Sequence, residues 1–271
     1  MEFFDTHCHI HEASADAAGD EFVRDKWAAG GFTDPRILID NAVKQGVTRL
    51  LCVGCTLKDS QMAVKLVAGQ PQCWASVGIH PHEAKDHLDS STQKAFGKLL
   101  EQPKAVAIGE CGLDFYYNHS SKPDQLRILD FQMELAVGHN LPMIFHVREA
   151  FKDFWSVYDK HKGIRGVIHS FSSTLQDLDQ ILSRGLYVGL NGIMTFTKNK
   201  EQLLAAKAIP LSSLLLETDA PFLTPAPCRG TICQPMHIVH TAEFLAELRN
   251  EDLTALAAAT TSNAYKLFGL E

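Results

Sequence analysis

The chain has 271 residues, of which 45% are hydrophobic and 21% are charged, and its formal net charge is -7. The length exceeds the usual size of one domain, although a single α/β barrel commonly has it, and no apolar run is long enough to cross a membrane. The negative charge argues against a broadly basic surface for nucleic acid but permits a local basic cleft. Seven scattered cysteines and the lack of an export signal at the amino terminus predict a cytoplasmic protein.

Short apolar segments alternate with longer segments of helical spacing along the whole sequence. After the first expected strand, residues 11–34 are polar and contain glycine, and we expect them to form a loop at the rim of the active site. Asp34-Pro35 then begins a helix, with an N-cap acid before a first-turn proline. The eight expected strands are 3–10, 47–54, 73–80, 105–112, 141–147, 166–171, 186–192 and 213–220.

This alternation predicts a single-domain (β/α)8 TIM barrel over residues 1–271. Several of the strands are nearly continuous apolar runs, as is typical of parallel strands covered on both faces. A helix is expected over 123–140, with Leu126, Leu129, Met133 and Val137 on one stripe. A proline-rich loop and two or three helices follow the last strand. A doubly wound open sheet is the alternative architecture.

Polar residues recur two positions apart at the carboxyl ends of the expected strands. The pairs are His7-x-His9, His80-x-His82, Glu110-x-Gly112-x-Asp114, His146-x-Arg148 and Glu217-x-Asp219, and a single His169 ends the sixth strand. Residues two apart on a strand face the same side, and barrel enzymes carry their chemistry at this end. Each pair alone is compatible with polar packing, an ion pair or a helix cap. Together they predict side chains that face the barrel axis and share a metal, because inward charges need partners.

Six of these residues combine imidazoles and carboxylates from five strands: His7, His9, Glu110, His146, His169 and Asp219. The set fits two divalent ions with Glu110 bridging them, at the separation of roughly 3.5–4 Å that two-metal sites use. Imidazole and carboxylate ligands suit zinc, manganese, nickel or iron, and a more weakly held, oxygen-rich position suits magnesium.

The chain resembles the TatD family of metal-dependent deoxyribonucleases, within the amidohydrolase superfamily, in the order and spacing of six motifs: FDTHCH, VGIHPH, AIGECGLDF, LPMIFHVREA, GVIHSFS and LLLETDAPFLTP. The resemblance runs from Phe3 to about Gly269. It implies that the six residues named above are the metal ligands, and that the other active-site residues are His80, His82, Arg148 and Glu217. It also implies hydrolysis of phosphodiester bonds, mainly 3′-to-5′ trimming of single-stranded or damaged DNA.

Two positions refine this resemblance. Many dinuclear amidohydrolases bridge their metals with a carboxylated lysine on the fourth strand, and Glu110 occupies that position here, which favours the nuclease branch. Family members often have a loop like R-G-K-x-N-x-P after the last strand, where this chain reads Arg229-Gly-Thr-Ile-Cys-Gln-Pro235. Thr231 and Cys233 replace a cation and an amide near the expected mouth of the site, which puts contacts with a nucleic-acid strand in doubt.

The expected mechanism is metal-assisted hydrolysis of an ester bond. Asp219 is the expected base, or the acid that orients the attacking water. Arg148 shares a strand face with His146 and is expected to grip a phosphate oxygen. His80 or His82 binds a phosphate or protonates the leaving oxygen, and the sequence does not choose between them. Glu217 holds a ligand histidine or orients the water.

Two other functions stay open at this point. The same site could cleave an ester, a lactone or a cyclic amide, and a substrate panel would separate this from nuclease activity. The barrel could also be a metal-binding interaction protein without catalysis, although an intact ligand set argues against it. We expect DNA as the substrate, no membrane association, and a monomer without an obligate protein partner.

Overall fold

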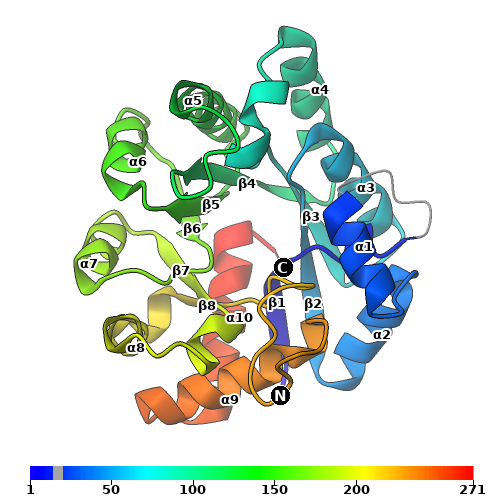
Figure 1. Cartoon of the computed structure of the whole chain (residues 1–271), viewed down its shortest axis with the longest axis vertical. Coiled ribbons are helices and arrows are strands. Elements are labelled where there is room, and N and C mark those ends of the chain that lie inside the picture. Colours follow the sequence, from blue (N-terminus) through cyan, green and yellow to red (C-terminus); the bar gives the residue numbers. More distant parts are fainter. Residues whose placement is uncertain (15–20, 271) are drawn as a thin grey trace. The chain divides into compact units, whose positions relative to one another are not determined.

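The structure is a computed structural model that describes residues 1–14 and 21–270. Eight parallel strands alternate with helices and follow the chain order in one sheet, from β1 to β8, which is the topology of a (β/α)8 barrel (Figure 1). This order is incompatible with the doubly wound alternative, in which the strand order reverses at a switch point. The contacts divide the chain into two compact units, Met1–Cys52 with Ser170–Glu271, and Val53–His169.

The first unit contains the beginning and the end of the chain. Its strands are β1 (Phe3–Cys8), all but the last residue of β2 (Val47–Val53), β7 (Tyr187–Leu190) and β8 (Leu214–Leu216). Its α-helices are α1 (Glu21–Ala29), α2 (Pro35–Lys44), α7 (Leu175–Ser183), α8 (Lys200–Ala208), α9 (Ile238–Arg249) and α10 (Leu253–Phe268). Short 3-10 helices are η1 (Ile10–Glu12), η3 (Gly192–Thr195), η4 (Leu211–Ser213) and η5 (Pro235–His237). The terminal helix α10 packs against β1 and β8.

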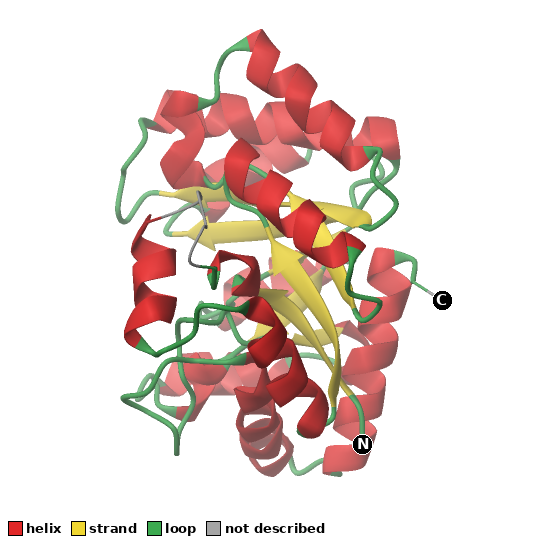
Figure 2. Cartoon of the chain, turned by 90° about the vertical axis from the view of Figure 1, so that its right-hand side faces the viewer, coloured by secondary structure: helices red, strands yellow, loops and turns green. Residues whose placement is uncertain are grey.

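The second unit contains the middle of the chain. Its strands are β3 (Cys73–Val77), β4 (Ala105–Asp114), β5 (Met143–Arg148) and β6 (Gly166–Ile168), and they pair in that order. Its helices are α3 (Leu57–Ala68), the 3-10 helix η2 (Pro81–Asp86), α4 (Ser90–Leu100), α5 (Lys122–His139) and α6 (Phe151–Tyr158). Figure 2 shows the strands in yellow with the helices in red. All ten residues of β4 are buried, including its two acidic residues.

All eight predicted strands are present, with their ends shortened or shifted by a few residues. The predicted helix start is also confirmed, because the Asp34 carboxylate accepts a hydrogen bond from the Arg36 backbone N–H at 2.9 Å. The predicted stripe of α5 is wrong at its end. Val137 is 49% exposed, and the buried face passes instead through Ile128, Leu129 and the nearby Gln132. Two helices, α9 and α10, follow the last strand as predicted.

The predicted loop over 11–34 is wrong for Glu21–Ala29, which forms α1. Val23 and Trp27 lie four residues apart, so they share one helix face, and both are buried. The Trp27 indole Nε1 donates to the backbone carbonyl of His9 at 3.0 Å, which ties the helix to the end of β1. Residues 15–20 of the predicted loop lie outside the described residues.

Within residues 1–14 and 21–270, no helix combines the length and the apolar character that crossing a lipid bilayer requires. The expectation that residues 1–271 fold as one domain stays a prediction, since the contacts divide into two units.

Candidate active site

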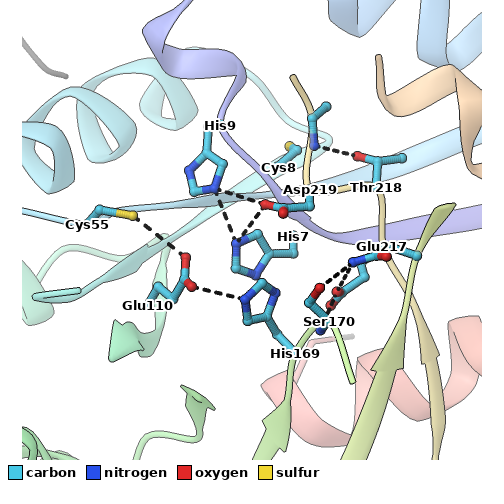
Figure 3. Close-up of polar contacts among 12 residues, drawn as sticks. His7, Cys8, His9, Cys55, Glu110, His169, Ser170, Glu217, Thr218 and Asp219 are labelled. Atoms are coloured by element: carbon cyan, nitrogen blue, oxygen red, sulfur yellow. Dashed lines mark hydrogen bonds and ion pairs between the residues drawn. The ribbon is translucent and has the colours of Figure 1, made fainter. Parts of the chain in front are cut away.

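In the first unit, two histidines and one aspartate converge at the end of β1. The Nε2 atoms of His7 and His9 lie 3.3 Å apart. Asp219, three residues after β8, places Oδ1 at 3.7 Å from His7 Nε2 and 3.4 Å from His9 Nε2 (Figure 3). His7 and His9 are buried, so the donor atoms meet where water is scarce. The spacing of two residues therefore places both imidazoles on one side, as predicted.

The buried carboxyl group of Asp5 holds the residue next to Asp219 in place. Asp5 Oδ2 accepts from the Thr218 hydroxyl at 2.6 Å, and Oδ1 accepts from the Thr218 backbone N–H at 2.9 Å. Burial raises the pKa of Asp5 to about 8, against the lowering effect of these hydrogen bonds. The backbone N–H of Asp219 donates to the His7 carbonyl at 2.8 Å. Hydrogen bonds therefore join β1 directly to Thr218 and to Asp219.

Glu217, at the end of β8, is held by the backbone and an amide. Its Oε1 accepts from the Ser170 backbone N–H at 2.7 Å (Figure 3). It also accepts from Asn191 Nδ2 at 3.2 Å. Asn191 also donates to the Ser170 hydroxyl at 2.9 Å. Asn191 was not among the predicted site residues. Its position directly after β7 was the only available signal.

In the second unit, three imidazoles surround one carboxylate oxygen of Glu110, on β4. Glu110 Oε1 lies 2.9 Å from His146 Nδ1, 3.0 Å from His169 Nε2 and 3.4 Å from His80 Nε2. The other oxygen, Oε2, lies 3.8 Å from the Cys55 thiol sulfur. Three of the predicted site residues of this unit therefore meet around the carboxylate of a fourth, Glu110.

Asp114, the last residue of β4, holds two of the histidines in place. Its Oδ2 lies 3.0 Å from His82 Nε2 and 3.1 Å from His146 Nε2, while its Oδ1 accepts the backbone N–H groups of Tyr116 and Tyr117 at 2.9 Å each. Burial would raise the pKa of Asp114, but the hydrogen bonds from His146 and His82 hold it well below its usual range. The sequence pattern contained Asp114 but indicated no role for it. The feature that could have indicated a role is its spacing: Asp114 lies two residues after Gly112 and four after Glu110, so all three face the same side of the strand.

Positive charge is favoured at His146. Burial lowers its pKa, but hydrogen bonds to Asp114 and Glu110 outweigh burial and raise it. Asp114 faces Nε2, so Nδ1 is directed toward Glu110. A divalent cation can supply this positive charge in place of a proton. Carboxylates that orient ligand histidines in this way are common around metals.

His80 and His82 differ in their surroundings. His80 Nδ1 accepts the backbone N–H of His82 at 3.2 Å, so a neutral His80 carries its proton on Nε2, toward Glu110. Burial lowers the pKa of His80 to about 4, although Glu110 acts in the opposite direction. His82 is instead paired with Asp114 and lies against the rings of Tyr117 and His119.

Arg148, at the end of β5, is exposed beside these histidines. Its guanidinium carbon lies 4.3 Å from the centre of the Tyr116 ring and 4.8 Å from that of Tyr117. Within the described part of the chain, no carboxylate pairs with this guanidinium. Its N–H groups therefore face solvent, where a phosphate can accept them.

The donor atoms of both units suit a divalent metal. His80, Glu110 and His146 form one group whose ligand atoms all lie within 4.8 Å of one another. His7, His9 and Asp219 bring two imidazole nitrogens and one carboxylate oxygen within 3.7 Å of one another. Imidazole nitrogen and carboxylate oxygen are the ligands of catalytic zinc and related ions. These clusters of the chain could hold metal.

The loop after β8 carries Cys233 and Thr231, and their side chains differ in exposure. Cys233 is fully buried, and its backbone N–H donates to the Pro221 carbonyl at 3.2 Å. The Cys233 side chain packs inward, with its sulfur 4.0 Å from the Thr218 carbonyl oxygen. The expectation that Cys233 stands near the mouth of the site stays a prediction. Thr231 is exposed, and its hydroxyl donates to the Cys228 carbonyl at 2.8 Å. Its nearness to a substrate strand stays a prediction.

The sequence matches the family described as TatD related DNase over residues 4–269. It is 35% identical over 241 residues to the 3'-5' ssDNA/RNA exonuclease TatD of Escherichia fergusonii, covering 86% of this chain and 92% of that protein. The protein of the same name in Escherichia coli K12 is 36% identical over 239 residues, with 84% of this chain and 90% of the relative covered.

Solved structures agree with this match. The TatD homolog YJJV of Escherichia coli K12 superposes with a TM-score of 0.84 at 26% identity, covering 99% of this chain and 98% of that one. The fold and the family expected from the six motifs are thus confirmed. The chain belongs to the TatD related DNase family, a family of hydrolases.

Proposed function

We propose that this chain is a metal-dependent exonuclease that hydrolyses phosphodiester bonds of single-stranded or damaged DNA from the 3′ end. The observation that carries the proposal is the Glu110 carboxylate oxygen, which three imidazole nitrogens approach within 3.4 Å. Such a set serves a divalent cation, and relatives that are 35% and 36% identical to this chain carry the name 3'-5' ssDNA/RNA exonuclease TatD. RNA is included in those names, so we propose single-stranded RNA as a second substrate.

The proposed metal ligands fall into two groups. His7, His9 and Asp219 hold one divalent ion, and Glu110, His146 and His169 hold a second. The mixture of imidazole and carboxylate suits zinc, manganese or nickel, with magnesium at a weaker position. When bound, such ions neutralise charge on the phosphate and make water more acidic. The bridging role expected of Glu110 stays a prediction.

The remaining residues supply proton transfer and phosphate contacts. Asp219 accepts a proton from the attacking water, or orients that water. Arg148 donates to a non-bridging phosphate oxygen, which agrees with its exposed guanidinium. His80 carries a proton on Nε2 and is our choice over His82 for the leaving oxygen, because His82 is committed to Asp114. Glu217 positions its neighbours through Ser170 and Asn191.

The setting of the reaction is part of the proposal. Seven cysteines that are all reduced thiols suit the cytoplasm, which keeps thiols reduced. We propose a monomer, since nothing in the sequence pattern requires a second chain.

The test is digestion of oligonucleotides labelled at the 5′ end or at the 3′ end, after dialysis against a chelator and again after adding back single metals. The expected result is stepwise loss of nucleotides from the 3′ end of single strands, which stops on chelation and returns with metal. A blunt duplex of the same sequence is the control substrate. Hydrolysis of esters or lactones without any cleavage of oligonucleotides would overturn the proposal in favour of a carbonyl substrate.

A further inference from the structure

Two exposed tyrosines follow β4 immediately after the carboxylate that supports His146. Tyr116 is 54% exposed and Tyr117 is 52% exposed, whereas most large apolar rings of the chain are buried. Their ring centres lie 4.8 Å apart with the planes at 90°. Tyr117 also stacks on His119 at 5.7 Å and contacts His82 by an edge. Tyr116 packs beside Tyr117, and the Arg148 guanidinium carbon lies 4.3 Å from the centre of the Tyr116 ring.

The turn that carries these rings is held rigidly. Asp114 Oδ1 accepts the backbone N–H groups of both tyrosines. Gln125, buried on α5, accepts the Asp114 backbone N–H at 2.8 Å and donates to the carbonyls of Asp114 and Ser120 at 3.0 and 2.9 Å. The Ser120 hydroxyl donates to the His82 carbonyl at 2.6 Å. An exposed ring on such a turn loses little entropy when a ligand binds, which favours a binding role.

The turn is connected to the chemistry by one side chain. The Asp114 carboxylate that fixes the tyrosines with Oδ1 binds His146 with Oδ2, and His146 lies 2.9 Å from Glu110. Across the strands, Asp114 pairs with Arg148, whose guanidinium lies over both tyrosine rings. The Arg148 guanidinium, which can bind a phosphate, and the tyrosine rings, on which a base can stack, therefore lie side by side at the ends of β4 and β5.

We infer that Tyr116, supported by Tyr117 and Arg148, is the platform on which a base of a single-stranded nucleic acid stacks while Arg148 binds the adjoining phosphate. The inference rests on the proposed nuclease function and deepens it. Aromatic side chains beside cations bind single strands because every base offers a flat face, and this recognition tolerates any sequence. A base inside a duplex has both faces covered, so the platform selects for single strands.

The test compares Tyr116→Ala with two controls in the full chain loaded with metal. Tyr116→Phe keeps the ring and removes the hydroxyl. Tyr187→Ala removes a partly buried tyrosine at the amino end of β7, the end of the strand opposite Asn191. We measure KM and kcat for 3′-end trimming of a single-stranded oligonucleotide, and its Kd without metal by fluorescence anisotropy. Thermal unfolding of each variant checks that the fold is kept.

Tyr116→Ala should raise KM and Kd about 10-fold, within the range found for the loss of one base stack, and leave kcat nearly the same. Tyr116→Phe and Tyr187→Ala should match the parent. Oligonucleotides with one abasic site, placed in turn at each of the last four positions, locate the stacked base. With the abasic site at that position, the Kd of the parent should rise by the same factor of about 10. The Kd of Tyr116→Ala should be the same for the abasic and the intact strand.

The outcomes separate the two proposals. If the parent trims oligonucleotides and Tyr116→Ala binds them with unchanged Kd and KM, the platform is wrong and the nuclease function stands. If the chain binds oligonucleotides through Tyr116 but cleaves none, the platform stands and the nuclease function fails. An equal loss for intact and abasic strands would assign Tyr116 to the shape of the turn and overturn the stacking role.

Discussion

The buried Asp114 orients two histidines and a turn at the same time. Its two oxygens bind His82 and His146 on one side and the turn of Tyr116 on the other. A carboxylate that holds the far nitrogen of a ligand histidine fixes both the ring orientation and the nitrogen offered to metal. We expect Asp114→Asn to lower metal affinity about 10- to 100-fold. Calorimetric titration of the chelated protein measures it.

The matched control is Asp130→Asn, which alters another histidine-paired aspartate. Asp130 Oδ1 lies 2.7 Å from His161 Nε2, and no proposed ligand is involved. That variant should bind metal like the parent. Equal metal affinity in Asp114→Asn and the parent would show that the strand backbone alone orients His146.

Glu110 is the residue whose substitution should reduce metal content and activity most. Three imidazoles share its Oε1, so Glu110→Ala leaves them without their common carboxylate. We expect the variant to lose at least one ion per chain and to slow trimming about 100-fold or more, beyond the effect of losing a supporting partner. Metal analysis after dialysis and single-turnover assays are the measurements.

The control for this change is Glu243→Ala, which removes an exposed glutamate paired with His240 on α9. It should keep the metal content and the rate of the parent. Retention of every ion by Glu110→Ala would remove Glu110 from the ligands and refute its bridging role as well.

The sequence located most of these residues because pairs two apart on a strand share one side. His7 with His9 was therefore readable, as was Glu110. The role of Asp114 was not, because it depends on the register that sets Asp114 opposite Arg148 and on which nitrogen of His146 faces it. Asn191 was missed because an isolated amide after a strand has no pattern around it.

Strand β4 has a glycine at a position that leaves no room for a side chain beside β5. Gly112 pairs with His146, and its φ is 146°, a conformation that other residues rarely adopt. A Cβ there would lie 1.9 Å from the His146 carbonyl oxygen, so the two strands would have to separate. We expect Gly112→Ala to lower the free energy of unfolding by about 2–3 kcal/mol, and to weaken metal binding because His146 moves. Urea unfolding measures the first effect.

Gly97→Ala, in the middle of α4, is the control for this substitution. Nothing lies within 4 Å of the added carbon, and alanine favours helix, so stability should rise by up to about 1 kcal/mol. Equal stability of Gly112→Ala and the parent would mean that β4 and β5 have room to adjust.

The elements themselves were predictable to different degrees. Strands were found because burial on both faces leaves continuous apolar runs, as in β6 and β8. Helix α1 was missed because its anchors are only Val23 and Trp27 within a polar stretch. The inward turn of Cys233 could not be read from the loop sequence, since it depends on packing beneath Thr218.

For the molecule as a whole, the fold class was predictable because the alternation of strands and helices determines it, whereas the cooperativity of the two units was not. The boundary at Cys52–Val53 falls inside β2, and the one at His169–Ser170 follows β6 by a single residue. Separate domains are usually joined by exposed, flexible linkers, and neither boundary has one. We therefore expect the units to unfold together, as one cooperative domain.

Single-tryptophan variants test this expectation, because Trp27 reports on the first unit and Trp155 on the second, and both are buried. In the variant that keeps only Trp27, urea unfolding followed by fluorescence should coincide with far-ultraviolet circular dichroism, as two-state behaviour requires. Adding Gly112→Ala, a change in the second unit, should then lower the midpoint of the Trp27 transition as much as that of the circular dichroism. A variant that keeps only Trp155 should give the same pair of coincident curves. If Gly112→Ala shifts the Trp155 transition and leaves the Trp27 transition in place, the units unfold separately and the single-domain prediction is wrong.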